Sequence, residues 1–180
     1  MQLKLASARE GYVWFRQGVW LFKKNPLAFL MLVFFYIFVA QFAILIPVFG
    51  VFIILVLTPA LTVGFMTACQ MVIREQRVYP TVYVTGLKDY GPEVRKNLLK
   101  LGTVYSFLVL VLSLVASSFI DFQQLLPLLT EEKPPSIREV KELYYGLAVG
   151  VALYVPVAML MWFSPVLVAW EKMSVAKALF

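Results

Sequence analysis

The side chains in this sequence that could do chemistry are mainly hydroxyls set within long apolar runs. In the run that begins at Leu101, four hydroxyls recur on one helical face: Thr103, Ser106, Ser113 and Ser117. The preceding run presents Thr58, Thr62 and Cys69 in a similar way. Such a polar seam could line a permeation path, or it could serve packing and hydrogen bonding between helices. We favour the second interpretation because small polar residues commonly have that use in membrane bundles.

The residue types that usually carry catalysis are missing from these runs. The chain has no histidine, and Cys69 is its only cysteine, so a disulfide within the chain is impossible and zinc or Ser-His-Asp sites lose their usual residues. No Asp, Glu, Lys or Arg lies inside the runs, although such residues mark proton relays and ion pathways in membranes. We therefore expect a protein that is not an enzyme and has no catalytic, cofactor or metal site.

Two motifs could shape helices within the runs. Thr58-Pro59 and Ser164-Pro165 form a matching pair, one in each half of the chain. Each proline frees a backbone carbonyl and kinks its helix, and the adjacent hydroxyl can help to satisfy that carbonyl. Paired interruptions can mark a transporter binding site, but we favour simple kinks, with a duplicated helix pair as an alternative origin. Gly146 and Gly150 form a GxxxG pattern that predicts close helix packing, either within the fold or in a homo-oligomer.

Composition and run length indicate how these residues are positioned. The chain has 180 residues, of which 62% are hydrophobic and 14% charged, which is typical of a membrane protein. Residues 27–73 carry no charge, and as one helix they would be about twice as long as the ~30 Å hydrocarbon core, so the chain must reverse near Pro47 and Gly50. We predict an all-α polytopic transmembrane bundle with four spans: 27–46, 50–72, 101–120 and 144–170.

The basic residues predict the orientation of the spans. Thirteen of the 16 Lys and Arg residues lie in 1–26, in the 74–100 connection or in the tail after Trp170, whereas only three lie in the 121–143 loop. The positive-inside rule then places 74–100 and both termini in the cytoplasm and 121–143 outside. This topology accounts for the net charge of +6 without nucleic acid as a partner.

Residues 1–26 precede the first span and contain no continuous apolar core of a signal peptide. Apolar side chains recur at helical spacing at Tyr12, Phe15, Val19 and Phe22, while a basic residue repeats every seven positions on another face. This pattern predicts an amphipathic helix on the cytoplasmic face. The helix could lie in the membrane interface or pack on the ends of the spans, and the sequence leaves both open.

Three stretches resemble an uncharacterised family of proteobacterial polytopic inner-membrane proteins. They are the basic helix that ends in Phe22-Lys23-Lys24-Asn25-Pro26, the segment 59–64, and the segment 162–170 together with 177–180. The chain is more distantly similar to the membrane domain attached to some glycerophosphodiester phosphodiesterases. The resemblance implies six spans, no known activity and no site residue. We therefore expect 1–180 to be a single integral membrane domain that the natural chain extends through two more spans.

Two function classes follow. The first is a non-enzymatic protein of the bacterial inner membrane that organises the envelope or binds lipids or a membrane partner. The alternative is a transporter of small molecules or lipids that uses the polar seam and the proline kinks. A transporter needs a polar-lined cavity at mid-membrane depth and a scaffold does not, so the cavity distinguishes the two.

Overall fold

The structure is a computed structural model that describes residues 8–46, 49–118 and 137–179. Four helices in this part of the chain are long and apolar enough to cross a membrane, which confirms the predicted all-α polytopic bundle. They are α2 (Pro26–Ile44), α3 (Phe49–Ile73), α5 (Pro92–Ser117) and α7 (Ile137–Trp170). Shorter elements connect or flank them: α1 (Ala8–Lys24), η1 (Pro80–Val84), α4 (Thr85–Lys88) and α8 (Val175–Leu179).

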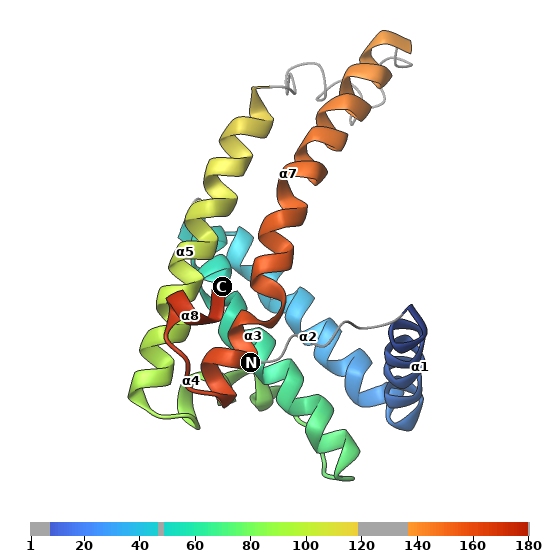
Figure 1. The fold of residues 1–180 in the computed structure, drawn as a ribbon, viewed down its shortest axis with the longest axis vertical. Coiled ribbons are helices and arrows are strands. Elements are labelled where there is room, and N and C mark those ends of the chain that lie inside the picture. The colour runs from blue at the N-terminus through green and yellow to red at the C-terminus, as the bar shows by residue number, and fades with distance from the viewer. Residues whose placement is uncertain (1–7, 47–48, 119–136, 180) are drawn as a thin grey trace.

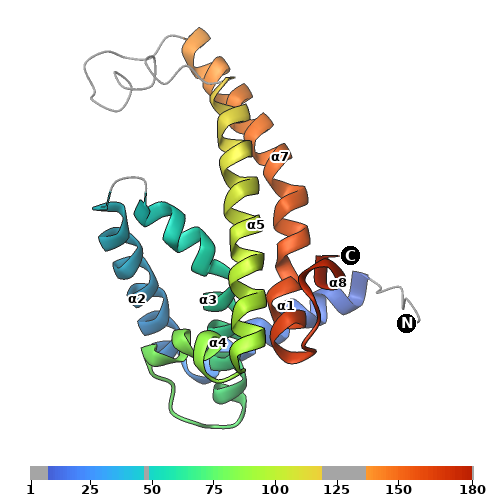
Figure 2. The same cartoon turned by 90° about the vertical axis from the view of Figure 1, so that its left-hand side faces the viewer.

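The four spans form two hairpins of unequal length (Figures 1 and 2). Helices α5 and α7 run side by side, and the shorter α2–α3 pair leans against their lower half. Helix α3 is the central element because it contacts α2, η1, α4, α5 and α7. The short elements α1, η1, α4 and α8 all gather at one end of the bundle, which we call the basic end.

Local sequence explains where the helices begin and end. The Asn25 side chain accepts a hydrogen bond from the Ala28 amide (3.2 Å), and Pro26 then starts α2 with a fixed φ. Helix α3 ends in a Schellman motif, with bonds from Gln76 N–H to Met71 O (2.9 Å) and from Glu75 N–H to Val72 O. Glu75 has a φ of 60°, a left-handed conformation that usually belongs to glycine.

Two apolar clusters hold the bundle together, and both involve α3. One joins α2, α3 and η1 around the fully buried Leu32. The other joins α3, α5, α7 and α8 around Leu98, Leu101 and Val168, which are also fully buried. Most other large apolar side chains of the spans are exposed, as expected where the surrounding solvent is lipid.

Glycine allows α3 to approach its neighbours closely. A Cβ at Gly102 of α5 would overlap the backbone of Val56 in α3, and one at Gly86 of α4 would lie 2.6 Å from the carbonyl oxygen of Ala60. Because no side chain fits at either position, the backbones of α5 and α4 contact the backbone of α3 directly there. By contrast, a Cβ at Gly150 would meet only the Ala116 Cβ, at an ordinary 3.9 Å.

Candidate functional site

A cavity of about 370 Å³ lies between α3, α5 and α7. It brings together the two proline motifs from opposite halves of the chain. Its lining comprises Thr58, Pro59, Thr62, Met66, Tyr105, Tyr154, Ala158, Met161, Trp162 and Pro165. This volume is in the range of pockets that hold small molecules, which are also mostly apolar with a few placed polar groups.

The most distinctive polar group in the cavity is a pair of tyrosines. The hydroxyl oxygens of Tyr105 in α5 and Tyr154 in α7 lie 3.0 Å apart, and either can donate to the other. Once one hydroxyl donates, the O–H of its partner remains available as a donor. The cavity therefore offers an O–H group to an acceptor atom and offers no carboxylate or ammonium group.

The hydroxyls beside both prolines reach carbonyls one turn earlier in their own helices. Thr58 donates to the Ile54 carbonyl (2.9 Å). The Ser164 hydroxyl lies within hydrogen-bonding distance of two carbonyls, that of Leu160 in its own helix and that of Ala178 in α8, and its single proton can be donated to one of them at a time. In each case the acceptor in the same helix lies one residue before the carbonyl that the proline frees. The expectation that these hydroxyls satisfy the freed carbonyl is therefore wrong, because the side chain reaches back a full turn to residue i−4.

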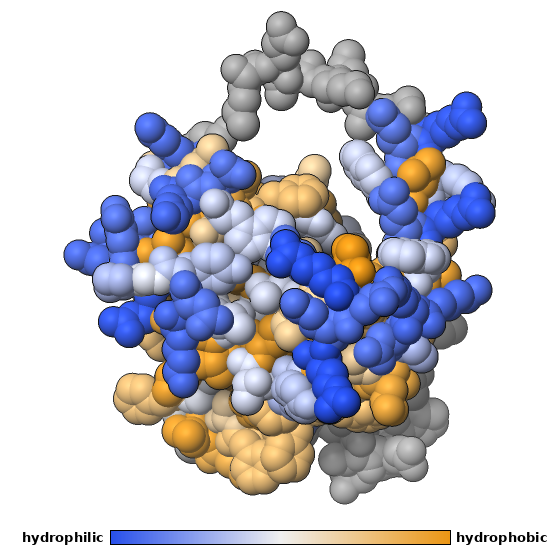
Figure 3. Space-filling model, turned by 90° about the horizontal axis from the view of Figure 1, so that it is seen from below, coloured by the Kyte–Doolittle hydropathy of each residue, from blue (hydrophilic) through white to orange (hydrophobic). Residues whose placement is uncertain are grey.

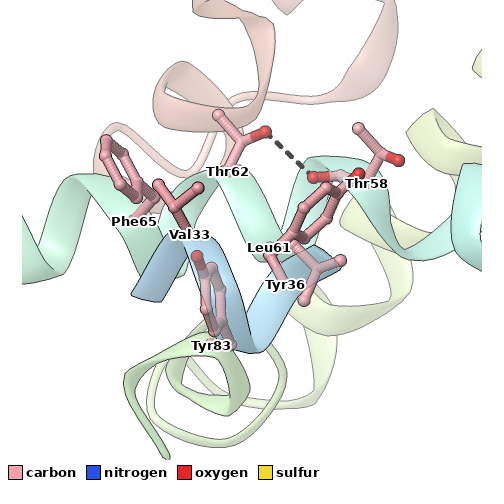
Figure 4. A pocket seen from close by; sticks show the side chains of 7 residues that line it. All are labelled: Val33, Tyr36, Thr58, Leu61, Thr62, Phe65 and Tyr83. Carbon is pink, nitrogen blue, oxygen red and sulfur yellow. Dashed lines mark hydrogen bonds between the residues drawn. The ribbon is translucent and has the colours of Figure 1, made fainter. Parts of the chain in front are cut away.

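A second cavity, of about 270 Å³, lies on a neighbouring face of α3, against α2 and η1 (Figure 4). Its walls are almost entirely apolar and aromatic, and they include Val33, Tyr36, Leu61, Phe65 and Tyr83. Thr58 and Thr62 line this cavity as well as the first one. Figure 4 shows the Thr62 hydroxyl bonded to the Thr58 carbonyl, at 2.9 Å. The two threonines therefore form the wall that separates the cavities.

Tyr83 lines the second cavity from η1, on the side of the basic end. Its hydroxyl donates to the Leu32 carbonyl at 3.1 Å and so ties η1 to α2. Burial raises the pKa of the Tyr83 hydroxyl, and the nearby Tyr36 raises it further. Tyr83 therefore remains neutral at physiological pH and keeps its proton for this hydrogen bond.

Comparison with known proteins assigns the family. The chain is 42% identical over 185 residues to a protein of Burkholderia thailandensis named a probable inner membrane protein. The alignment covers all of this chain and 68% of that relative. The chain belongs to this family of inner-membrane proteins. No family model matches the chain, and no solved structure matches it.

The remaining residues of the predicted polar seam lie away from both cavities of this inner-membrane protein. Each donates its hydroxyl to a carbonyl of α5 itself, three or four residues earlier. Ser106 is buried, whereas Thr103, Ser113 and Ser117 are exposed. The structure thus brings Thr58, Thr62, Pro59 and Pro165 together and leaves the α5 hydroxyls outside the site.

Sequence reasoning did not single out three residues that shape the site or its surroundings. Tyr105 and Tyr154 face each other in the cavity, and a third proline, Pro156, lies inside α7 near Tyr154. The sequence signal that could have indicated this pair is a tyrosine within the apolar part of each of the two spans. The expectation that the protein has no metal site rests on the sequence. Among the described residues, no group of three or more Cys, Asp or Glu side chains lies close enough to hold an ion.

Proposed function

We propose that this inner-membrane protein binds a neutral, largely apolar molecule of lipid type in the cavity between α3, α5 and α7. The observation that carries the proposal is the Tyr105–Tyr154 hydroxyl pair inside an otherwise apolar lining. The apolar wall would take a hydrocarbon chain or ring, and the free tyrosine O–H would donate to a carbonyl or hydroxyl oxygen of the ligand.

The absence of charge from the lining supports a neutral ligand. A charged group taken from water into an apolar site costs a large free energy unless a partner of opposite charge meets it. The lining residues supply no such partner. A neutral polar group requires only a hydrogen bond, which the tyrosine pair can provide.

The depth of the cavity supports a ligand that arrives from the lipid. Lys100 is the last basic residue of α5 before the apolar part, and Tyr105 lies five residues further along the helix. At the helical rise this places Tyr105 about 7.5 Å beyond Lys100 along the helix axis. The cavity would then lie inside the hydrocarbon region of one leaflet, where it is open to lipid-soluble molecules.

We propose further that the protein acts without catalysing a reaction, since tyrosines are the only ionisable groups in the cavity. The bias of basic residues supports an orientation in which the basic end and both termini face the cytoplasm. We also propose that the protein assembles in the envelope, either with a second copy of itself or with another membrane protein. The distant similarity to the membrane domain of some glycerophosphodiester phosphodiesterases is also a proposal, and it adds no residue to the site.

The test is native mass spectrometry of the purified protein, combined with identification of the lipids that it retains. Ala158→Phe places a ring in the cavity and should abolish retention of one defined lipid-soluble species. Ala152→Phe, on an exposed position of the same helix, is the matched control and should retain it. Tyr105→Phe should weaken retention, because it removes one hydroxyl of the pair. If Ala158→Phe and Ala152→Phe retain the same molecules at the same stoichiometry, the cavity is not the binding site.

A transporter is the alternative function, and the shared Thr58–Thr62 wall favours it. A small bend of α3 at Pro59 would shift this wall and join the two cavities past the shared threonines. The transporter proposal predicts that a cross-link between α2 and α5, which would fix the cavities, stops uptake or efflux of the ligand while leaving its binding intact. Binding and transport that are unchanged by the cross-link would contradict it.

A further inference from the structure

Helix α1 carries an apolar stripe that the described part of the protein leaves largely exposed. Tyr12, Phe15, Val19 and Phe22 follow one another on one side of the helix and are 66%, 71%, 39% and 45% exposed. A basic stripe runs directly beside them and consists of Arg9, Arg16 and Lys23, all exposed. From Gly11 to Trp20 every residue of α1 is exposed.

The contacts that fasten α1 to the bundle gather near its C-terminal end. The ring of Phe22 lies 6.2 Å from that of Phe29 in α2, and Leu21 packs against the cluster between α2 and α3. Lys24 forms an ion pair with Glu75 (3.1 Å) and donates to the Ile73 carbonyl (3.3 Å) at the end of α3. Helix α1 is therefore anchored at one end, and among the described residues nothing covers its stripe at Tyr12, Phe15 and Val19.

The spans determine where this helix sits relative to the bilayer. In Figure 2 α1 runs across the basic end at a large angle to α5 and α7. Because α2 begins directly after α1, the C-terminal end of α1 lies at the level where the first span enters the hydrocarbon region. The apolar surroundings nearest to the exposed stripe are therefore the lipid acyl chains just below the headgroups.

The charge of this surface selects the kind of lipid. Figure 3 views the molecule from the basic end and shows hydrophilic side chains gathered over much of it. Exposed basic residues of other elements lie at the same end, among them Arg74, Arg77, Arg95 and Lys96. Juxtamembrane clusters of Lys and Arg attract anionic headgroups, and an adjoining apolar stripe lets the helix enter the interface.

We propose that α1 is a binding surface for anionic phospholipid, with its apolar stripe in the headgroup boundary and Arg9, Arg16 and Lys23 on lipid phosphates. The long basic side chains can extend along the apolar stripe while their charged ends reach the headgroups. Trp14 and Trp20 suit the same layer because their rings are amphipathic. This surface is separate from the cavity, so the proposal does not depend on which ligand the cavity binds.

The test places one environment-sensitive fluorophore on either side of α1 in the full chain. Phe15→Cys reports the apolar stripe and Gln17→Cys the opposite side of the helix, each in a Cys69→Ser background. The proteins are reconstituted in nanodiscs of phosphatidylcholine with or without phosphatidylglycerol. We expect the label at position 15 to shift to the blue when phosphatidylglycerol is present, and the label at position 17 to stay unshifted.

Neutralising the basic stripe with Arg9→Gln, Arg16→Gln and Lys23→Gln should abolish the dependence on phosphatidylglycerol, as should high salt, which screens surface charge. The proposal is overturned if the label at position 15 reports water in both kinds of nanodisc. It is equally overturned if that label reports an apolar environment whatever the lipid charge, and where this happens only in discs that hold two copies of the chain, a second copy covers the stripe.

Discussion

Replacement of Gly102 by alanine is expected to destabilise the bundle, since this glycine lies at the crossing of α5 and α3. The added Cβ would overlap the carbonyl oxygen and carbon of Val56 and approach its Cα at 2.9 Å. All three atoms belong to the backbone of a helix, so no side chain can rotate away to make room. The two spans would have to separate, and this would disturb the apolar cluster around Leu98 and Leu101.

The expected size follows from the cost of overpacking. Extra methyl groups in a well-packed core typically cost about 1–3 kcal/mol, and a clash with backbone belongs at the upper end. Alanine gains roughly 0.5–1 kcal/mol over glycine in a helix, which offsets only part of that cost. Gly150→Ala is the matched control, because its Cβ would lie 3.9 Å from the Ala116 Cβ and would strain nothing. We expect that variant to be as stable as the parent, or more stable by up to about 1 kcal/mol.

Cys69 supplies the assay, since it is the only cysteine and lies half-buried in α3. A thiol-reactive dye that fluoresces on reaction reports the exposure of Cys69 as the detergent-solubilised protein is heated. Gly102→Ala should lower the temperature of this transition, whereas Gly150→Ala should leave it unchanged or raise it. If Gly102→Ala unfolds at the parent temperature and Gly150→Ala unfolds earlier, the GxxxG pattern sets the critical contact and our reasoning fails.

Three further predictions concern topology and hydrogen bonds. Single cysteines at Lys88 and Lys141, in a chain without its native cysteine, should react with an impermeant maleimide from opposite sides of the membrane, and reaction of both from one side would refute the topology. The double variant Ser106→Ala, Ser113→Ala should lose little stability in the same thermal assay, about 0.6 kcal/mol per hydroxyl or less, while Ser113→Asp should cost about 2.5 kcal/mol or more if that position is deep in the membrane. Tyr83→Phe removes the donor to Leu32 and should cost about 1 kcal/mol, and no change in the transition would show that this bond contributes nothing.

The long elements could be predicted from the sequence because membrane insertion depends on composition and length. Residues 27–73 lack charge, and the predicted reversal falls between the end of α2 at Ile44 and the start of α3 at Phe49. Pro47 lies outside the described residues, and Gly50 lies in the first turn of α3. The predicted span 101–120 starts later than α5, since the helix already begins at Pro92 in the polar region. Hydrophobicity marks where a helix enters lipid, and a helix can begin before that point.

The site could be predicted only in part, because it depends on the contacts between helices. Thr58, Thr62, Pro59 and Pro165 stand out from the sequence, since hydroxyls and prolines are conspicuous in apolar runs. The Tyr105–Tyr154 pair depends on the rotation and vertical register of α5 against α7, which neither helix specifies alone. The same reason applies to Gly86 and Gly102, whose close neighbours lie on another helix, whereas the GxxxG spacing describes one helix only.

The two proline motifs share a structural arrangement that goes beyond their sequence. After Pro59, the backbone of α3 at Ala60 meets Gly86 of the short helix α4. Before Pro165, the Ser164 hydroxyl of α7 lies 2.9 Å from the Ala178 carbonyl oxygen of the short helix α8, which is the second of its two possible acceptors. Each of these two spans is therefore contacted beside its proline by a short helix that comes later in the chain, α3 by α4 and α7 by α8. Both prolines line the same cavity as Tyr105 and Tyr154. We therefore expect the short helices at the basic end to help set the shape of this cavity, and a displacement of either one to change the position of the Tyr105–Tyr154 pair.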